Sequence, residues 1–453
     1  MNPLAKAYME RIFRAAVAAV NPDMLVRKVL RSGEDGVSLH LRGEVSATAC
    51  WDEIRNLYVV GGGKAARGMG ESVARVLGDR VTEGILAVPK GTGGEYKAIR
   101  FAEAGYPIPD EGSREATQSM MDLLSGALKE DLVLAILSGG GSSMISATPA
   151  SISIGEKECV LRLLLRAGAD IGEVNTVRRH ISLVKGGRMA EAAYPARVWV
   201  LLLSNVPGND PADVASGPFS PDPTTYQGAL HVLKRYKILQ EVPSSVLHHL
   251  ESGAAGEVPE TFKPGNPVFQ GVTTIILGSN RTAFEAAAEA ARSDRAVMVR
   301  TNPGFLRGEA RECGRAFVSE MRKMADRASP GRTIILLAGG ELTVTVTGKG
   351  KGGRCQEFAL AAAISLDGTE GMAVLCGSTD GMDGITDAAA GFAYGDSCAR
   401  ARAKGYSPRA LLDDNDSHTL LSAINNLLRT GPTGTNVADI AVGVIAPGRR
   451  GIR

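Results

Sequence analysis

Two glycine-rich loops carry the residues whose types and spacing first suggest chemistry. Each follows an apolar run, and the positions of interest are Gly62, Gly63 and Lys64 in GGGKAARGMG and Ser138, Gly139, Gly140, Gly141, Ser142 and Ser143 in LSGGGSSM. Glycines let a backbone approach a phosphate closely, and free amides, hydroxyls and a lysine can then bind its oxygens. The loops therefore favour binding of phosphate or of an acidic substrate. A plain strand-to-helix turn is the structural alternative for each.

The middle of the chain adds cations and carboxylates. The segment NTVRRHISLVKGGRMA gathers positive charge, including Arg178 and Lys185, and is either a solvated helix face or part of an anion site. The neighbouring segment SNVPGNDPADVASGP places Asn205 and Asp210 directly after an apolar run. Phosphoryl transfer needs Mg²⁺ held by a few oxygen ligands, and a carboxylate can orient or deprotonate the attacking hydroxyl. Asp210 is our candidate for the magnesium ligand or for the group that assists the nucleophile.

The second half of the chain offers an arginine and further carboxylates. The segment GGELTVTVTGKGKGGRCQEFALAAA predicts a strand, a turn through Gly348 to Gly353, and a helix that begins near Arg354. An arginine after paired glycines suits bidentate binding of carboxylate or phosphate oxygens, whereas the alternative is an exposed edge hairpin with a basic turn. The segment STDGMDGITDAAAG lacks the closing glutamate of a calcium loop. The candidate binding residues from this half are Glu341, Gln356, Glu357, Asp380 and Asp383.

The elements that must position these residues follow from the apolar runs. Five buried strands are predicted to end in glycine-rich loops, at residues 57–70, 132–144, 198–210, 333–344 and 372–384. Their alternation with alanine-rich helical stretches indicates an α/β protein, and in a parallel sheet such loops meet at one edge, where an anionic ligand can bind. The Gly-, Pro- and Glu-rich stretch 251–267 is the candidate domain boundary. After it, the strand TTIILGSN and a helix from Thr282 to Arg292 are expected to open a second α/β unit.

Composition and charge limit the classes of function. With 453 residues, of which 44% are hydrophobic and 22% charged, the chain suits a globular protein of two domains. Its 51 basic and 49 acidic residues give a net charge of +2, so neither nucleic acid nor an anionic membrane is an expected partner. The six cysteines form no zinc or disulfide pattern, and the N-terminal segment predicts an amphipathic helix rather than a secretory signal. Since no apolar run approaches the roughly 20 residues that span a bilayer, a cytoplasmic location is expected.

In order and spacing, the motifs resemble those of the glycerate 2-kinases of the MOFRL type, whose relatives are sometimes labelled hydroxypyruvate reductase. The resemblance extends over nearly the whole chain and rests on GGGKAARG, LSGGGSSM, NTVRRHISLVKGGRMA, NVPGNDPADVASGPFSPDPTTY, GGELTVTVTGKGKGGRCQEFALA, STDGMDGITDAAAG and TGPTGTNVADI. At Cys355 the chain departs from the G-R-N-Q-E pattern typical of this family, which has asparagine there.

The resemblance implies a Rossmann-like parallel-sheet N-terminal domain over residues 1–262, a smaller mixed α/β MOFRL domain over residues 263–453, and an active site in the interdomain cleft. It also implies ATP and Mg²⁺, with D-glycerate as the small-molecule substrate and 2-phosphoglycerate and ADP as products. Lys64 and Arg354 would be the principal catalytic cations, one from each domain, and Asp210 would assist them. A monomer or a homodimer is expected.

The residues alone leave two rival functions open. A nicotinamide-dependent hydroxypyruvate reductase would use the near match to G-x-G-x-x-G at Gly61 and Gly63, in which Ala66 takes the last glycine position. A non-catalytic protein would instead use the same loops to sense an acidic metabolite. A turnover assay distinguishes these two possibilities from a kinase.

Overall fold

The chain forms two compact units. The computed structural model describes residues 3–327 and 332–446. One unit, here called the central unit, comprises Pro22–Leu277, and the other, the flanking unit, combines Met1–Asn21 with Gly278–Arg453. These limits differ from those of the predicted domains, because the N-terminal segment belongs to the same unit as the C-terminal half.

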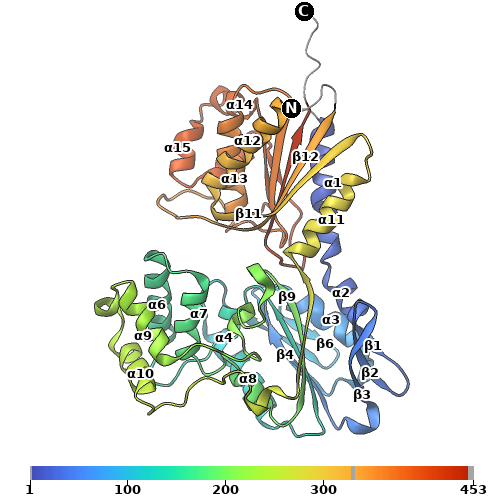
Figure 1. Ribbon diagram of the computed structural model, residues 1–453, viewed down its shortest axis with the longest axis vertical. Coiled ribbons are helices and arrows are strands. Elements are labelled where there is room, and N and C mark those ends of the chain that lie inside the picture. The colour runs from blue at the N-terminus through green and yellow to red at the C-terminus, as the bar shows by residue number, and fades with distance from the viewer. Residues whose placement is uncertain (1–2, 328–331, 447–453) are drawn as a thin grey trace, which may run out of the picture. The chain divides into compact units, whose positions relative to one another are not determined.

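A seven-stranded sheet forms the centre of the central unit (Figure 1). In spatial order its strands are β10 (Val272–Ser279), β9 (Arg197–Ser204), β8 (Leu132–Ser138), β4 (Leu57–Gly62), β5 (Glu83–Pro89), β7 (Ile99–Ala104) and β6 (Gly94–Tyr96). Strands β9, β8, β4, β5 and β7 are parallel, and β6 pairs antiparallel with β7. The predicted strands β4, β8 and β9 are confirmed, and since they are parallel neighbours, the loops that follow them lie at one edge of the sheet.

Helices cover this sheet, and a smaller sheet lies beside it. The helices of the central unit are α2 (Pro22–Val29), α3 (Ala66–Leu77), α4 (Glu111–Ser125), α5 (Gly141–Met144), α6 (Ile154–Arg166), α7 (Ile171–His180), α8 (Arg188–Ala193), α9 (Tyr226–Arg235) and α10 (Ser244–Ala254). The small antiparallel sheet contains β1 (Leu30–Ser32), β2 (Gly36–Leu41) and β3 (Glu44–Cys50). Figure 1 shows α6, α7, α9 and α10 gathered into a helical group on the side of the unit away from the small sheet.

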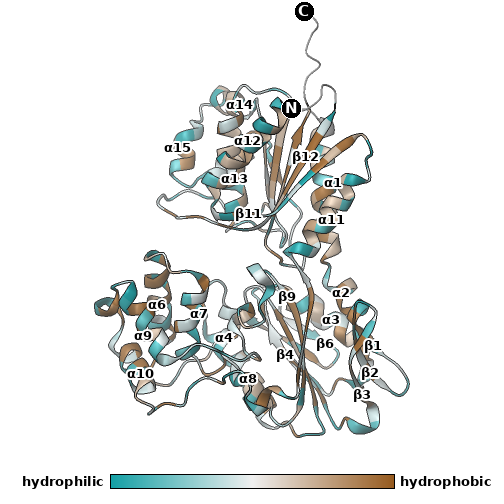
Figure 2. Ribbon diagram, viewed as in Figure 1, coloured by the Kyte–Doolittle hydropathy of each residue, from teal (hydrophilic) through white to brown (hydrophobic). Residues whose placement is uncertain are grey.

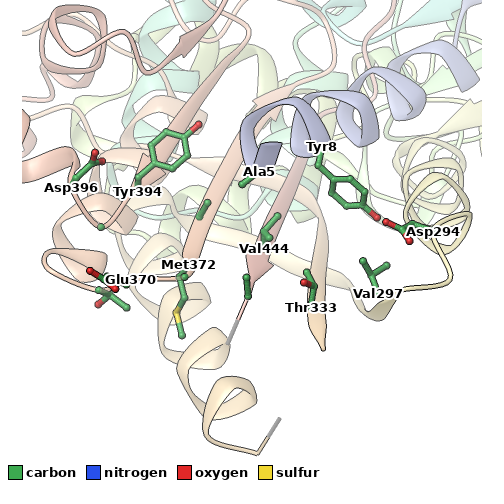
Figure 3. A pocket seen from close by; sticks show the side chains of 15 residues that line it. Ala5, Tyr8, Asp294, Val297, Thr333, Glu370, Met372, Tyr394, Asp396 and Val444 are labelled. Atoms are coloured by element: carbon green, nitrogen blue, oxygen red, sulfur yellow. The ribbon is translucent and has the colours of Figure 1, made fainter. Parts of the chain in front are cut away.

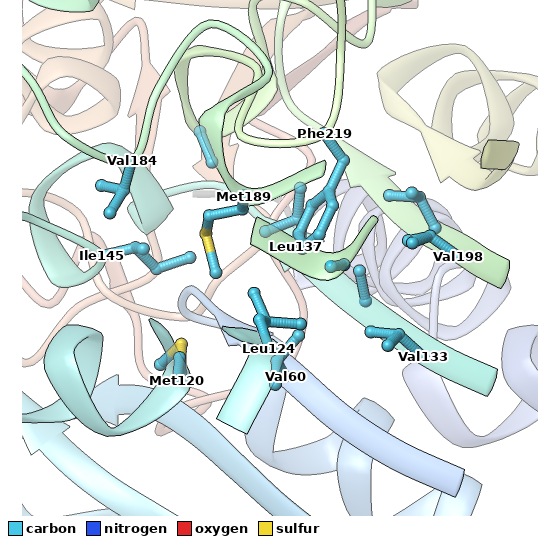
Figure 4. Close-up of a cluster of buried hydrophobic side chains, with 14 of the residues drawn as sticks. Val60, Met120, Leu124, Val133, Leu137, Ile145, Val184, Met189, Val198 and Phe219 are labelled. Carbon is cyan, nitrogen blue, oxygen red and sulfur yellow. The ribbon is translucent and has the colours of Figure 1, made fainter. Parts of the chain in front are cut away.

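The core of the central unit lies between the seven-stranded sheet and the helices α4 and α8. Met120 and Leu124 of α4 and Met189 of α8 are fully buried against sheet residues such as Val60 and Leu137 (Figure 4). The helical group has a separate apolar cluster of its own. The strands are therefore packed against α4 and α8, while the loops at their carboxyl-terminal ends remain available for a ligand.

The flanking unit contains a six-stranded mixed sheet. In spatial order its strands are β11 (Val297–Glu309), β12 (Thr333–Thr343), β16 (Asp439–Ile445), β13 (Met372–Ser378), β14 (Ala390–Tyr394) and β15 (Leu427–Leu428). Strand β16 is antiparallel to both β12 and β13, so these two run in the same direction and end at the same edge. Asp439, the first residue of β16, lies there opposite Gly340 and Ser378.

Helices cover both faces of this second sheet. They are α1 (Pro3–Ala19), α11 (Asn280–Arg292), α12 (Ala310–Asp326), α13 (Arg354–Leu366), α14 (Ser397–Ala403), α15 (Pro408–Asp413) and α16 (Ser417–Ala423). Phe13 of α1 packs over Gly377, while Phe317 and Met321 of α12 pack over Gly443. In Figure 2 the strands of both sheets are largely hydrophobic, and the hydrophilic residues lie mainly on the helices and loops.

The predicted N-terminal amphipathic helix is confirmed as α1, but the sequence did not indicate its partner. The hydroxyl of Tyr8 donates a hydrogen bond to the carbonyl of Ala291 (3.2 Å), and the hydroxyl of Thr435 donates one to the carbonyl of Val20 (2.7 Å). The helix is thus bound to residues far along the chain. None of the helices in the described part of the chain has the length and apolar character that a membrane span requires.

One expectation and one alternative differ from the structure. The strand TTIILGSN, expected to open the second unit, is β10 and adds to the edge of the first sheet beside β9. The edge hairpin, which was the structural alternative for the segment after β12, is absent from residues 344–353, because side chains rather than a partner strand bind the amides there. Asn415 accepts from Thr347 N (2.8 Å), and Asp416 accepts from Lys351 N (3.0 Å).

Substitution of Gly61 tests how closely β4 and β8 approach each other. A Cβ at this position would lie 2.0 Å from the carbonyl oxygen of Ile136, and its φ of +131° is a conformation that side chains rarely adopt. We expect Gly61→Ala to lower the free energy of unfolding by about 3 kcal/mol, because the two strands must separate. Urea unfolding followed by circular dichroism measures the change.

Gly78→Ala is the matched control. Gly78 also has a positive φ, of +62°, but nothing lies within 4 Å of an added Cβ. Its ψ is −130°, so this variant should lose only about 1–2 kcal/mol, the cost of this glycine-favouring backbone conformation alone. Equal losses in the two variants would contradict the crowding between β4 and β8.

Candidate active site

The two glycine-rich loops of the central unit touch each other. The amide of Lys64 donates to the carbonyl of Gly139 (2.9 Å), and the amide of Ala65 donates to the hydroxyl of Ser138 (3.0 Å). A Cβ on Gly63 would lie 2.3 Å from that hydroxyl, so a glycine is needed where the loops meet. The adjacency of β4 and β8 in the sheet accounts for this contact, and it brings Lys64 next to the serine-containing loop.

Lys64 extends across the second loop toward an aromatic ring. Its Nζ lies 4.4 Å from the ring centroid of Tyr106, a distance typical of a cation–π interaction. Gly140, at φ +89°, lies beneath the lysine stem, since a Cβ there would be 3.3 Å from Lys64 Cγ. Ser143 at the end of the loop donates its hydroxyl to the carbonyl of Pro107 (2.7 Å). The lysine is therefore directed by its surroundings rather than left as a loose surface chain.

A polar network joins the second loop to α7. The hydroxyls of Ser142 and Ser216 lie 3.0 Å apart, and Ser216 is the last residue of the 3-10 turn η4 (Val214–Ser216). Arg178 donates to Asn175 Oδ1 (2.6 Å) and to the Ser216 hydroxyl (3.3 Å). Asn175 donates in turn to Asp213 (3.0 Å). The sequence prediction included Ser142 and Arg178 but missed Asn175 and Ser216.

Lys185 lies beneath the same loop. It is fully buried, and its ammonium donates to the carbonyl of Gly141 (3.3 Å). Gly141 itself has no room for a side chain, because a Cβ would lie 2.9 Å from Ala215 Cβ. Burial, followed by the positive charges of Lys157 and Arg178, holds the pKa of Lys185 well below its usual value. The predicted residues of this loop and of the basic segment are thus brought together.

Asp210 and Asn205 lie apart from the contacts just described. Asp210 is exposed and accepts from the amide of Ala212 (2.9 Å), and it lines a 370 Å³ pocket that is otherwise formed largely by prolines and apolar residues. Asn205 is half-buried directly after β9. The carboxylate that joins the polar network is Asp213. Within the described residues there is no group of three acidic, histidine or cysteine side chains that could hold a metal, and the role of Asp210 stays a prediction.

In the flanking unit, Arg354 is held between two carboxylates at the mouth of α13. Its Nε lies 3.0 and 2.8 Å from the two carboxylate oxygens of Asp439, and Nη1 lies 3.0 Å from Glu341 Oε1. Burial alone would lower the pKa of Arg354, but the two carboxylates outweigh it and keep the guanidinium charged. Burial raises the pKa of Asp439 to about 7, against the opposing effects of Arg354 and of the Leu342 amide (3.0 Å).

Asp383 fixes the first turn of α13. Its two carboxylate oxygens accept from the amide of Cys355 (3.0 Å) and from the amide of Gln356 (2.8 Å), and the Gln356 side chain donates a third bond (3.0 Å). A carboxylate on free amides at a helix N-terminus is electrostatically favourable. Asp383 and Gln356 therefore position Arg354 through the backbone.

The remaining predicted residues of this half make internal contacts. Glu357 is buried between Arg311 Nε (2.8 Å) and Asn415 Nδ2 (2.9 Å). Asp380 accepts from the Ser378 hydroxyl (2.8 Å) and the Met382 amide (3.1 Å) in the loop after β13. Both contribute to the shape of the loops around Arg354.

Position 355, where the family pattern has asparagine, belongs to the core. Cys355 is fully buried in the apolar cluster between α12 and the sheet, and it interacts with the buried Cys376. Burial holds the pKa of the Cys355 thiol well above its usual value. The cysteine thus replaces asparagine at an interior position without adding a reactive thiolate.

Asp439 is the functional candidate that sequence analysis missed. It is the only acidic residue in the quoted motif TGPTGTNVADI, and it directly precedes an apolar run. That placement could have indicated a carboxylate at the edge of a sheet. Its partner was not deducible, because the pairing with Arg354 depends on β16 lying between β12 and β13.

A larger pocket of the flanking unit lies at the opposite edge of its sheet (Figure 3). Its volume is about 510 Å³, and it is bordered by Thr333 and Met372, which begin β12 and β13. Its charged lining residues are acidic, namely Asp294, Glu370 and Asp396, and no lysine or arginine is among the described residues that line it. This pocket is unsuited to an anionic substrate, and the cluster around Arg354 is the better candidate.

Comparisons with known proteins agree along nearly the whole chain. A profile of DUF4147, a domain of unknown function, matches residues 8–251, and a profile of the MOFRL family matches residues 334–439. A glycerate 2-kinase of Pyrococcus horikoshii is 36% identical over 97% of this chain and 97% of that protein. A D-glycerate 2-kinase of Thermotoga maritima is 38% identical over 86% of this chain and 90% of that protein.

A solved structure gives the same result. The crystal structure of a glycerate kinase from Thermotoga maritima has a TM-score of 0.78 and 34% identity to this chain, covering 98% of it and 100% of the solved chain.

A relative from Agrobacterium vitis, 37% identical over 96% of this chain and 93% of its own length, carries only a provisional name as a hydroxypyruvate reductase. The chain belongs to the glycerate 2-kinase family of the MOFRL type.

Proposed function

We propose that this protein is a glycerate 2-kinase, which transfers the γ-phosphate of MgATP to the 2-hydroxyl of D-glycerate and releases 2-phosphoglycerate and ADP. The observation that carries this proposal is similarity along nearly the full chain to two proteins that are named glycerate 2-kinases. The cations and glycine-rich loops described above are of the kind that such a reaction needs. A phosphoryl group in transfer carries dispersed negative charge, which positioned cations and amides stabilise.

The loops around Lys64 are proposed to hold one of the two anionic substrates. The backbone of Gly62, Gly63 and the loop 139–141 can approach phosphate or carboxylate oxygens closely, because no side chains stand in the way. Lys64 then supplies charge where the ligand binds. The hydroxyl of Ser142 is placed to add a directed hydrogen bond.

Arg354 is proposed to be the second catalytic cation. Two of its nitrogens are directed by Asp439 and Glu341, and the rest of the guanidinium fork can bind an oxyanion. Mg²⁺ would arrive as part of the substrate MgATP, because it commonly reaches kinases bound by phosphates and needs few protein ligands. Asp210 stays a candidate ligand or base.

The finer division of the chain is part of the same proposal. By sequence, residues 1–262 would form the Rossmann-like domain and residues 263–453 the MOFRL domain, and the family matches at 8–251 and 334–439 fall within these limits. The compact units divide the chain differently, because Met1–Asn21 belongs with Gly278–Arg453. The interdomain cleft, the monomeric or homodimeric state and the cytoplasmic location stay predictions.

An enolase-coupled assay tests the reaction. Purified protein is incubated with D-glycerate, ATP and Mg²⁺, and enolase is added without phosphoglycerate mutase. We expect phosphoenolpyruvate to form only when both ATP and glycerate are present, because enolase accepts the 2-phosphate and not the 3-phosphate.

Other outcomes of this assay separate the alternatives. ADP release without phosphoenolpyruvate would indicate a different regioisomer. No ADP release, combined with oxidation of NADH or NADPH by hydroxypyruvate, would replace the kinase by the reductase. The absence of turnover in both assays would contradict both enzymes.

Lys64→Met tests the first cation. The substitution keeps the length of the side chain and removes its charge, so we expect kcat to fall by ~10²-fold or more while the circular dichroism spectrum is unchanged. Lys28→Met, at an exposed position of α2, is the control and should retain activity. Near-normal turnover in a folded Lys64→Met enzyme would contradict the assignment.

Asp439→Asn tests how Arg354 is held. The carboxylate pairs with Arg354 when ionised, and because its pKa is about 7, wild-type kcat/KM should fall as the pH drops below that value. At pH 8 the kcat/KM of the variant should be lower than that of the wild type by ~10-fold or more. The pH profile of the variant should also lack the acidic limb. An acidic limb that persists in the variant would assign it to another group.

The same carboxyl group has an opposite effect on stability. Its folded pKa of about 7 exceeds its ordinary value of 3.8, so the folded protein binds more protons between these two values. Its contribution to stability is complete below the lower value and is lost as the pH rises through about 7. The free energy of unfolding of wild type minus that of Asp439→Asn should therefore decline over this interval, which urea titrations at several pH values measure.

A further inference from the structure

Three cationic side chains from different segments act electrostatically on one another inside the central unit, around the loop that contains α5. Lys157 lies on α6, Arg178 lies on α7, and Lys185 follows α7. Lys157 and Lys185 are 1% and 0% exposed, and Arg178 is half-buried. Burial of so much positive charge is unfavourable unless an anion balances it.

Neutral groups, rather than carboxylates, accept their hydrogen bonds. The ammonium of Lys157 donates to the hydroxyl of Ser146 (2.7 Å), and that of Lys185 donates to the Gly141 carbonyl. Arg178 donates to an amide oxygen and a hydroxyl, as described above. Among the ion pairs of the described residues, none includes any of the three cations.

The adjacent Arg179 shows the contrast. It pairs with Asp213 (3.0 Å) and with Asp222 (3.2 Å), so the fold supplies carboxylates to a structural arginine at the next position of the same helix. None of the other three forms an ion pair within the described residues, and Glu158 favours the charged forms of Lys157 and Arg178 without a direct contact that would neutralise them. An arrangement of this kind suits a ligand that brings the negative charge.

All three cations are linked to the second glycine-rich loop. Lys185 bonds to the first residue of α5, and Arg178 reaches Ser142 through Ser216. Lys157 bonds to Ser146, two residues after the end of α5. A change in the charge of any of them acts on the loop that is proposed to bind substrate. Burial, and then the charge of Arg178, lowers the pKa of Lys157 to about 8, as expected for like charges held together.

We propose that Lys157, Arg178 and Lys185 form a pocket for one substrate oxyanion, in which Arg178 contacts the anion and Lys157 is a positioning residue that acts through Ser146 and Lys185. The inference deepens the proposed function and rests on it. The oxyanion is either the carboxylate of the hydroxy acid or a phosphate of the nucleotide. Lys157 lies outside every glycine-rich motif and outside the basic segment 175–190, so the sequence alone did not indicate it.

Lys157→Met tests this role, because methionine has a similar length and no charge. We expect the melting temperature of the unliganded variant to equal or exceed that of the wild type, since repulsion among buried cations is relieved. We expect KM to rise at least 10-fold for one substrate, with a smaller change in kcat. If Lys157 only supported the fold, the variant would have a lower melting temperature and both KM values would be unchanged. This result would overturn the proposal.

The substrate whose KM rises identifies the source of the anion. A rise for D-glycerate assigns the pocket to the carboxylate, and a rise for MgATP assigns it to a phosphate. Lys129→Met, at an exposed lysine between α4 and β8, is the control and should change neither KM nor melting temperature. Ser146→Ala is a second variant, expected to raise the same KM while leaving the lysine in place.

Binding measurements keep this test separate from the identity of the reaction. Thermal shifts of the full chain are recorded with D-glycerate, with MgATP and with inorganic phosphate, none of which requires turnover. A ligand-induced shift in the wild type that is lost in Lys157→Met supports the pocket even if the enolase assay fails. Equal shifts in wild type and variant for all three probes would overturn the pocket while leaving the kinase assignment intact.

Discussion

The ion pair between Arg354 and Asp439 fixes the working edge of the flanking unit. Asp439 begins β16 between the ends of β12 and β13, Glu341 is contributed by β12, and Arg354 begins α13. One guanidinium thus binds together segments that are widely separated in the chain. The sheet buries Asp439 and so places it next to Arg354. In turn, the ion pair connects α13 to the ends of β12 and β16. The amides held by Asp383 complete the support for α13.

The two units treat their cations differently. In the flanking unit, carboxylates neutralise and direct the arginine, which keeps it charged and in one orientation. In the central unit, carboxylates pair with the buried Arg179, whereas hydroxyls, an amide and a carbonyl accept the hydrogen bonds of Lys157, Arg178 and Lys185. The first arrangement favours orientation, and the second favours affinity for an anion. A kinase with two anionic substrates has a use for both.

Much of the scaffold was predictable from local patterns. Strands β4, β8, β9, β12 and β13 have apolar runs that end in glycines, and burial on both faces leaves such runs no other stable arrangement. The contact between the loops at Gly63 and Ser138 followed from two parallel strands becoming neighbours. The strands themselves depend on short segments, whereas the loop contact also depends on β4 and β8 pairing in the sheet.

The rest depended on tertiary pairing. A single aspartate before an apolar run, such as Asp439, looks the same whether it faces solvent or an arginine. In the sequence, Lys157 occupies an ordinary polar position of an amphipathic helix. Its burial could not be predicted, because it depends on how α7 and the loop after α5 pack. Strand β10 had the right pattern, but the pattern does not say which sheet a strand joins.

The placement of α1 has a consequence for how the protein is made. Its buried residues Met9, Ile12, Phe13 and Ala16 pack with a unit whose sheet includes β16 near the other end of the chain. Within this chain, α1 is synthesised before the central unit, whereas its partners, from α11 to β16, are synthesised after that unit, which can already collapse in the meantime. The apolar face of α1 therefore stays exposed to solvent until these partners have been synthesised. Loss of β16 would therefore remove part of the surface that buries α1.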